Sequence, residues 1–304
     1  MLLPPFDQSQ RFYRGNLHGH STHSDGVLSP QEVVNFYRSH QYDFTCISDH
    51  LWSDKSFCAD TVLDARHMNR DDFITIPSAE LHCRGKAYAA DGLWHIVANG
   101  LPLDFKMAAD DEPVDVMINR AMDAGAYVTV AHPEWYAMTN TEAQTVSHAH
   151  GVEILNYSCV ISSARGSGIA VADVLLNEGN RITFTATDDS HFELPDAGGG
   201  WVMVAADALD ADKIVTALKE GRHYSSTGAE LKSMALEGKT LIVETSPVDH
   251  IIVSGSGYTA MSVSGDGLGR AEFDLSSFKS PFFRVTVRDP LGRQAWSNPY
   301  FMDG

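Results

Sequence analysis

The chain has 304 residues, of which 43% are hydrophobic, and this length is sufficient for a full α/β domain and a small second domain. Its formal net charge is −18 and it has no cluster of Lys and Arg, which excludes a general groove for long nucleic acids. No apolar run approaches the ~20 residues that span a bilayer, and the N-terminus lacks a signal peptide pattern. We therefore expect a cytoplasmic protein with no membrane partner.

Short apolar runs typical of β-strands each lead into polar residues that can bind metals. Five runs, each followed here by its polar residues, are 14–17 (His18, His20), 44–47 (His50), 73–76 (Glu80), 127–131 (His132) and 182–186 (Asp189, His191). Two further residues are placed differently, since His95 starts an apolar run and Asp25 lies in a loop. Because the carboxyl ends of parallel strands converge in a barrel, we expect one polar site on one face.

Capping signals predict helices between these strands. Ser29 begins a capping box and is followed by Pro30 at the first helical position. Helices are also predicted at 113–124, 169–178 and 211–220, and each of these ends before a glycine. The repeated order of strand, helix and strand predicts a parallel sheet.

The pattern changes after Tyr224. Short strands are predicted at 231–236, 240–244, 250–253 and 283–287, with turns at 237–238, 255–257, 265–267 and 289–292. This spacing predicts an antiparallel β-sandwich of about 80 residues. The expected organisation is therefore a metallohydrolase barrel at 1–224 and a C-terminal β-sandwich domain at 225–304.

The potential ligands are more informative together than singly. A lone histidine after a strand is more often a hydrogen-bonded structural residue than a ligand. Here the sequence offers two histidines at i and i+2, an Asp-x-His sequence and a glutamate after a strand. Together these residues make a ligand set that Zn, Mn or Fe favours. The set predicts a polynuclear metallohydrolase.

Four short motifs carry a family resemblance. The run NLHGHSTHSDG at 16–26, with SDH at 48–50, AHP at 131–133 and DSH at 189–191, resembles the PHP (polymerase and histidinol phosphatase) superfamily of metal-dependent phosphoesterases. The resemblance extends from about Tyr13 to Tyr224. It implies a distorted, TIM-like (β/α)7 barrel with two to three divalent metal ions. The segment 284–299 also resembles the C-terminal part of a branch that includes carbamate hydrolases.

The resemblance also implies how the ligands are shared in a trinuclear site. A first ion would be held by His18, His20, Glu80 and Asp189, a second by Glu80, His95 and His132, and a third by Asp25, His50 and His191. Glu80 would thus bridge two ions. We expect a small phosphomonoester or phosphodiester to be hydrolysed by a metal-bridged hydroxide that attacks phosphorus.

Other residues are expected to assist. Asp49 and Asp188, each beside a ligand, are catalytic candidates that would orient an imidazole. Because a guanidinium fits phosphate oxygens, Arg165 in the loop 162–168 is the first candidate for binding a small anionic substrate. The next candidates are Arg84, Lys86 and His23.

Two alternative functions remain open at this point. The same ions would support hydrolysis of a carbamate, amide or ester, in which attack on carbonyl carbon needs no phosphate clamp. A non-catalytic metal-binding protein built on an enzyme scaffold is the other alternative. The completeness of the ligand set disfavours this last alternative.

Overall fold

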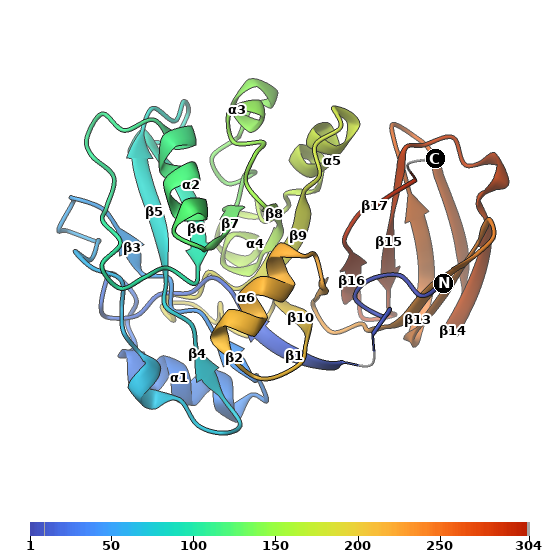
Figure 1. Cartoon of the computed structure of the whole chain (residues 1–304), viewed down its shortest axis with the longest axis horizontal. Helices are drawn as coiled ribbons and strands as arrows, with labels where there is room; N and C mark the ends of the chain where they lie inside the picture. The colour runs from blue at the N-terminus through green and yellow to red at the C-terminus, as the bar shows by residue number, and fades with distance from the viewer. Residues whose placement is uncertain (9, 303–304) are drawn as a thin grey trace.

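The computed structural model describes residues 1–8 and 10–302. Figure 1 shows the strands up to β10 on one side of the molecule and the strands β13 to β17 on the other, with the N-terminus beside the latter. No helix in the described residues is long and apolar enough to cross a membrane. The structure is a mixed α/β fold with two large sheets.

The strands of the two sheets are as follows. The larger sheet has 11 strands in the order β12 (Leu231–Glu237), β13 (Thr240–Ser254), β15 (Phe282–Arg288), β16 (Gln294–Ser297), β11 (His223–Ser226), β10 (Trp201–Ala206), β1 (Arg11–Asn16), β2 (Phe44–Thr45) and β4 (Ile74–Thr75), with β14 (Ala260–Asp274) beside β13 and β17 (Tyr300–Phe301) beside β15. The smaller sheet has six strands in the order β3 (His50–Leu51), β5 (Ser78–Arg84), β6 (Leu93–Asn99), β7 (Tyr127–Val130), β8 (Gly151–Asn156) and β9 (Thr183–Thr187).

The helices predicted from capping signals are present. The helices are α1 (Pro30–Ser39), α2 (Val114–Asp123), α3 (Asn140–Thr145), α4 (Tyr157–Ser163), α5 (Ile169–Asn177) and α6 (Ala211–Lys219), with 3-10 turns η1 (Arg66–Met68) and η2 (Leu275–Ser277). The capping box of α1 is complete, since Ser29 and Glu32 each accept from the other's backbone N–H. Helix α4 was not predicted, and it includes the first residues of the expected loop 162–168.

The prediction of a parallel sheet is wrong for several strand pairs. Strands β1, β2 and β4 are parallel, as are β7, β8 and β9. Strands β5, β6 and β7 are successively antiparallel, and β10 is antiparallel to β1. The segment 85–92 between β5 and β6 explains the first exception, because a parallel crossover needs about a dozen residues or more.

Backbone hydrogen bonds join the two sheets where the potential ligands lie. Asp189 donates its N–H to the carbonyl of His18 at 2.9 Å, and Glu80 donates to the carbonyl of Ser48 at 2.8 Å. Ser48 in turn donates to the carbonyl of Gly19 at 2.7 Å. The segments that follow β1, β2 and β9 are therefore held against one another and against β5, although these segments are far apart in sequence.

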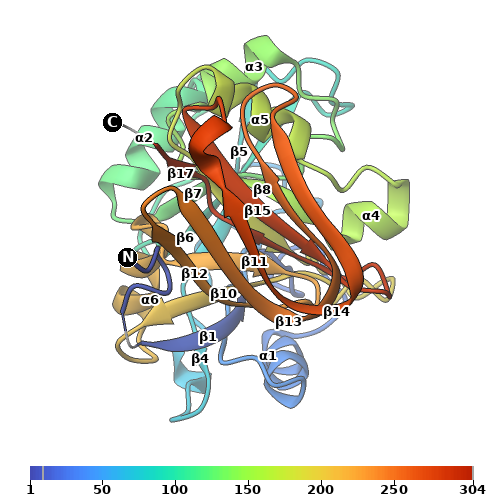
Figure 2. The same ribbon diagram turned by 90° about the vertical axis from the view of Figure 1, so that its right-hand side faces the viewer.

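The C-terminal strands continue the larger sheet. Strand β11 pairs with β10 on one side and β16 on the other, so the predicted boundary between residues 224 and 225 lies inside this strand. The runs predicted at 240–244 and 250–253 are one strand, β13, and the turn predicted at 265–267 lies within β14, so both of these expectations are wrong. The pairing of β13 with β14 shifts in register on both sides of Val248, so the two long strands contain an irregularity there. Figure 2 shows these long, curved strands facing the viewer.

Candidate metal centre

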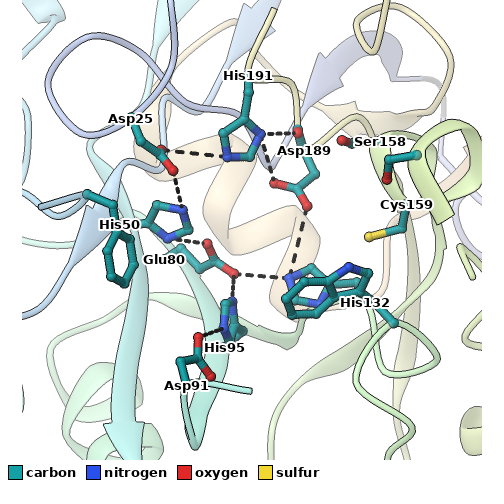
Figure 3. A pocket seen from close by; sticks show the side chains of 13 residues that line it. Asp25, His50, Glu80, Asp91, His95, His132, Ser158, Cys159, Asp189 and His191 are labelled. Atoms are coloured by element: carbon teal, nitrogen blue, oxygen red, sulfur yellow. Dashed lines mark hydrogen bonds and ion pairs between the residues drawn. The ribbon is translucent and has the colours of Figure 1, made fainter. Parts of the chain in front are cut away.

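The potential ligands converge in one buried cluster. His18 and His20 follow β1, His50 begins β3, and Glu80 lies in β5. The others are His95 in β6, His132 after β7, Asp189 and His191 after β9, and Asp25 in the loop after β1. Figure 3 shows His50, His95 and His132 arranged around Glu80, with Asp25, His191 and Asp189 on the other side of the cavity. The convergence expected from the sequence is thus observed.

The antiparallel course of β6 explains the unusual place of His95 in its strand. His95 lies near the start of β6 and is paired in register with His82 of β5. Its Nδ1 is 2.9 Å from Glu80 Oε1. A residue at the start of an antiparallel strand meets the end of its neighbour, so both side chains reach the same edge of the sheet.

Two ligands have backbone conformations that are uncommon outside glycine. His132 has φ of 25° and Asp189 has φ of 56°. Such conformations cost roughly 1–3 kcal/mol and persist where the surrounding structure fixes them, often at functional sites. The conformations turn both side chains into the cavity directly after β7 and β9.

One group of side chains surrounds Asp25. Asp25 Oδ2 is 3.5 Å from His50 Nε2, and Oδ1 is 3.6 Å from His191 Nε2 and 3.9 Å from His20 Nδ1. Ligands of one tetrahedral zinc ion are separated by roughly 3.4 Å, since each bond is about 2.0–2.1 Å long. These atoms are too far apart for ordinary hydrogen bonds, and their spacing fits a shared cation.

Glu80 connects this group to a second one. Its Oε1 is 2.9 Å from His95 Nδ1 and 3.2 Å from His132 Nε2. Its Oε2 is 3.5 Å from His18 Nε2 and 3.7 Å from His20 Nε2. The two oxygens of one buried carboxylate therefore face different pairs of imidazoles, which is the arrangement required of a bridging ligand.

Asp189 occupies a similar position between histidines. Its Oδ1 lies 2.9 Å from His20 Nε2 and 3.1 Å from His18 Nε2, and its Oδ2 lies 4.0 Å from His132 Nε2. The carboxylate also accepts a hydrogen bond from Asn156 Nδ2 at 3.0 Å, which fixes its orientation.

Several buried polar atoms of the cluster have no hydrogen-bond partner. These atoms include His18 Nε2, His20 Nδ1 and Glu80 Oε2. Leaving such atoms unsatisfied costs roughly 1–3 kcal/mol each, so buried groups of this kind normally have partners. All three atoms point toward neighbouring ligands, and imidazole with carboxylate is a donor set that Zn, Mn and Fe accept. The residues present therefore fit divalent cations.

The electrostatics of the cluster keep its carboxylates ionised. Burial alone would raise the pKa of Asp25, but the neighbouring imidazoles, above all that of His50, outweigh burial and lower it to about 2. Burial and the neighbouring imidazoles lower the pKa of His20 to about 3. This ring is therefore uncharged at pH 7 and can offer a nitrogen lone pair to a cation. Burial would also lower the pKa of His50, but Glu80 and Asp25 outweigh it and raise the pKa to about 10. The carboxylates thus attract positive charge to this position.

His82 contacts the cluster and was not predicted. Its Nδ1 donates to the carbonyl of Trp94 at 3.0 Å, which leaves Nε2 to accept from His50 Nδ1 at 2.8 Å. His50 Nδ1 is also 2.7 Å from Glu80 Oε2, but Oε2 has no hydrogen bond of suitable geometry. A sequence signal was available, because His82 lies two residues after Glu80 and side chains at i and i+2 of a strand share a face.

Glu153 in β8 is the second residue that the sequence reasoning missed. Its Oε1 accepts from His18 Nδ1 at 2.7 Å and from Thr187 at 2.8 Å, and its Oε2 accepts from the backbone N–H of His132 at 2.9 Å. The hydrogen bond to Nδ1 leaves His18 Nε2 free to face the cluster. The available signal was a lone carboxylate within a buried apolar strand, where an unpaired charge is rarely tolerated.

Asp49 and Asp188 have other partners than those expected. Asp49 accepts from the N–H and hydroxyl of Ser21 at 2.7 and 2.8 Å and from Ser24 at 2.7 Å. Asp188 accepts from Tyr37 at 2.9 Å and from three backbone N–H groups at 198–200. Within residues 1–8 and 10–302, neither carboxylate has a hydrogen bond to an imidazole. These carboxylates therefore order the loops beside the potential ligands.

The four residues expected to bind substrate do not line the cavity. Lys86 is buried and pairs with Glu142 at 2.9 Å. His23 is hydrogen bonded to the carbonyl of Thr61 at 3.0 Å. Arg84 and Arg165 are exposed at the surface.

The cavity over the ligands has a volume of about 290 Å³, near the lower limit for small-molecule sites. Besides metal ligands it is lined by Phe57, Asp91, Trp135, Ser158, Cys159 and Ser162. Among the described residues, no Lys or Arg contributes to this lining. The recognition of a substrate therefore falls to the metal ligands, to hydroxyl groups and to aromatic rings.

Comparison with known proteins supports the fold. No protein-family model matches the chain, and no curated protein does. Among solved structures, it is similar to a two-domain protein containing a predicted PHP-like metal-dependent phosphoesterase from Bacteroides vulgatus, at 15% identity and a TM-score of 0.56, over 99% of this chain and 97% of that one. An amidohydrolase from Chromobacterium violaceum matches 58% of this chain and 87% of its own at 13% identity, with a TM-score of 0.39.

The likeness to the Bacteroides protein extends over both parts of the chain, including the strands after residue 224. It confirms, at the level of the fold, the resemblance to the PHP superfamily that the motifs carry. The chain thus combines a fold similar to that of the Bacteroides protein with a buried cluster of side chains that could bind metal ions.

Proposed function

We propose that the protein is a metal-dependent hydrolase that uses two or three divalent ions, Zn, Mn or Fe, to cleave a small phosphomonoester or phosphodiester. The observation that carries this proposal is the cluster of nine imidazole and carboxylate side chains, seven of which line one cavity, together with buried polar atoms of the cluster that have no hydrogen-bond partner. A site that only binds metal needs fewer ligands and no cavity above them, so catalysis is the better account.

Charge favours an anionic substrate. Three divalent ions carry more positive charge than Asp25, Glu80 and Asp189 carry negative charge, so the loaded site has a net positive charge. The ions themselves can then contact phosphate oxygens, and the missing Lys and Arg in the lining do not prevent phosphate binding. Bound ions of this kind supply Lewis acidity and lower the pKa of a coordinated water.

The chain's own residues determine the geometry of the reaction. Glu80 and Asp189 would hold ions close together, since their carboxylate oxygens lie 3.5 and 3.1 Å from His18 Nε2. Glu153 fixes the ring of His18 by accepting a hydrogen bond from its Nδ1. Water forms the new bond to phosphorus while the bond to the leaving oxygen breaks, and the leaving alcohol takes up a proton.

Hydrolysis of a carbamate, amide or ester is the second candidate. The observation that favours it is the absence of Lys and Arg from the cavity lining in the described residues. A carbonyl substrate carries less charge than a phosphate ester and needs no cationic clamp.

We also propose how the two sheets are organised. The backbone bonds between the ends of β1, β2, β5 and β9 support the interpretation of the two sheets as a distorted (β/α)7 barrel. Residues 225–304 would then form the separate β-sandwich domain, with β11 as the shared strand.

Metal analysis combined with a substrate panel tests the proposal. Protein purified without chelator should contain two to three equivalents of transition metal and should hydrolyse aryl phosphates faster than aryl carbamates. Less than one equivalent after metal loading would contradict the proposal. Metal-dependent activity on carbamates alone would establish the second candidate.

A further inference from the structure

Two aromatic side chains lie beside histidines of the cavity. The ring of Trp135 is 5.1 Å from that of His132 and 5.6 Å from that of His95, and the ring of Phe57 is 5.4 Å from that of His50. Both aromatic side chains line the cavity. We infer that the site selects phosphate esters whose leaving group is a planar, uncharged aromatic alcohol, with Trp135 as its main contact. This inference rests on the proposed phosphoesterase function.

Trp135 keeps a free surface although the adjacent Tyr136 is buried. Its exposed fraction is 38%, whereas that of the adjacent Tyr136 is 3%. The Tyr136 ring is 5.4 Å from His132 and 5.8 Å from His95, so Tyr136 already packs against these two ligands. Trp135 is therefore not needed to cover the imidazoles, and its exposed surface is available to a ligand.

The turn that carries Trp135 is held from several sides. Trp135 donates its N–H to the carbonyl of His132 at 3.0 Å, and Met138 donates to the carbonyl of Pro133 at 2.9 Å. Lys86 Nζ donates to the carbonyl of Tyr136 at 3.2 Å. A side chain presented by a fixed turn loses little conformational entropy on binding, so the aromatic surface is preorganised.

The remaining lining disfavours a charged leaving group. Ser158 and Ser162 of α4 offer hydroxyl groups, and Cys159 offers a thiol. The charged side chain that is not among the expected ligands is Asp91, a carboxylate 3.7 Å from His95 Nε2. A second phosphate or a carboxylate on the leaving group would find no Lys or Arg in this lining and would be repelled by Asp91.

The size of the cavity is compatible with one ring. A dry cavity of about 150 Å³ holds benzene, so the 290 Å³ available here accommodates an aromatic ring together with a phosphoryl group. A ring stacked on Trp135 is also attractive energetically, because indole offers a large apolar face.

Two phosphonates that resist hydrolysis isolate the contribution of the ring. We would titrate phenylphosphonate and methylphosphonate into the manganese-loaded protein and measure dissociation constants by calorimetry. The wild-type protein should bind phenylphosphonate about tenfold more tightly. In Trp135→Ala this ratio should fall to about one, and in Trp135→Phe most of it should remain. Binding of methylphosphonate should stay within about twofold in both variants, because that ligand does not reach the indole.

Ile161→Ala is the matched control, since Ile161 is also 38% exposed and lies in α4 outside the cavity lining. This variant should keep the wild-type ratio. Equal affinity of the wild-type protein for the two phosphonates would overturn the aromatic subsite while leaving the phosphoesterase proposal intact. If neither phosphonate binds, the phosphoesterase function is wrong and the inference fails with it.

Discussion

The chain of hydrogen bonds behind His50 shows how one unpredicted side chain can determine the chemistry of a ligand. Because the carbonyl of Trp94 can only accept, His82 carries its proton on Nδ1 and must accept at Nε2. His50 therefore donates to His82 through Nδ1, which leaves Nε2 as the atom that faces Asp25 and could bind an ion. His82 is thus a positioning residue, and its expected effect is on one metal site and not on the whole cluster.

Replacement of His82 tests this relation. His82→Ala removes the acceptor that fixes the His50 ring. The affinity for the ion held by His50 should therefore fall by about 10- to 100-fold. His82→Gln, whose amide oxygen can accept, should restore part of the affinity. A chelator titration that follows metal release measures both variants. Equal loss of all ions in His82→Ala would show that the residue supports the entire cluster instead.

Glu80 and Asp25 should differ in the breadth of their effects. Glu80→Gln keeps the shape of the side chain but removes the charge that allows two cations to lie close together, so turnover of phosphate and carbonyl substrates should fall at least about 100-fold. Asp25→Ala should release one ion and affect the phosphate substrate more, because its transition state carries more charge on oxygen. Metal content and activity of both variants are the measurements. Near-wild-type turnover by Glu80→Gln would exclude a bridging role.

Most of the potential ligands could be picked out from the sequence, because they follow strands at short distances and their motifs, such as His18-Gly19-His20, are local in sequence. Their supporting residues could not. Glu153 reaches His18 across 135 positions of the chain, and His82 supports His50 through pairing of β3 with β5. Such contacts depend on which strands become neighbours, and that information is not contained in any single segment.

At the scale of elements, the loop between β5 and β6 is tied to α3. Lys86 lies in this loop, is fully buried at its side chain and pairs with Glu142, whose side chain also caps α3 by accepting from Thr139. The amine additionally lies 4.6 Å from the centre of the Tyr136 ring. The positive charge that the sequence offered as a substrate contact therefore links the loop between β5 and β6 to α3.

Removing this charge should affect stability. Lys86→Met leaves Glu142 without its partner in a largely buried setting, which costs about 3 kcal/mol of the free energy of unfolding. Arg84→Ala, at an exposed neighbouring position, should change it by no more than about 0.5 kcal/mol. Urea denaturation of both variants provides the comparison. An Lys86→Met protein of normal stability but weakened phosphate binding would restore Lys86 as a substrate contact.

Elements with local signals were predicted well, and elements decided by tertiary pairing were not. The capping box of α1 and the glycines after α2, α5 and α6 lie within a few residues of the ends that they define. The direction of β6 and the continuity of β13 depend on their partners. The glycines at 265 and 267 indicated a turn, but β14 pairs with β13 at Ser264 and again at Leu268, so the strand continues across them as an irregularity.

At the scale of the whole molecule, β11 is the strand shared by the two parts of the chain, and its His223 is a buried neutral residue. His223 Nε2 donates to the carbonyl of Phe184 at 3.1 Å, and burial lowers the pKa of this ring from 6.5 to about 4. The unfolded chain therefore takes up a proton before the folded protein does. The stabilisation is complete above about pH 6.5 and is lost as the pH falls toward 4.

His223→Gln should make stability less dependent on pH. The shift of the His223 pKa corresponds to about 3 kcal/mol of unfolding free energy between pH 6.5 and 4. Other histidines titrate in both proteins. The slope of the unfolding free energy against pH is therefore measured by urea denaturation for the variant and for the wild type, and the two slopes are compared. Identical slopes would show that His223 is not protonated on unfolding in this interval.

The segment after β16 connects the C-terminal strands to the smaller sheet, which contributes most of the potential ligands. Asn298 accepts from the N–H of Phe184 at 2.7 Å and donates to the carbonyls of Gly221 and His223 at 3.0 and 2.9 Å. Phe184 belongs to β9, the strand that leads into Asp189. The C-terminal part therefore holds the start of β9, at the end of the strand opposite Asp189.

Asn298→Ala tests whether this support reaches the metal site. Loss of three hydrogen bonds by a buried amide should lower the free energy of unfolding by about 2–3 kcal/mol, because the partner groups on the backbone stay buried. Asn119→Ala, a control at an exposed position in α2, should cost at most about 0.5 kcal/mol. Chemical denaturation measures the stability, and the same samples give metal affinity by chelator competition. If Asn298→Ala weakens metal binding as well as stability, the C-terminal strands hold β9 in place for catalysis. A loss of stability with unchanged metal affinity would instead restrict their role to folding, since the backbone of Asp189 would then be fixed by its bond to His18 alone.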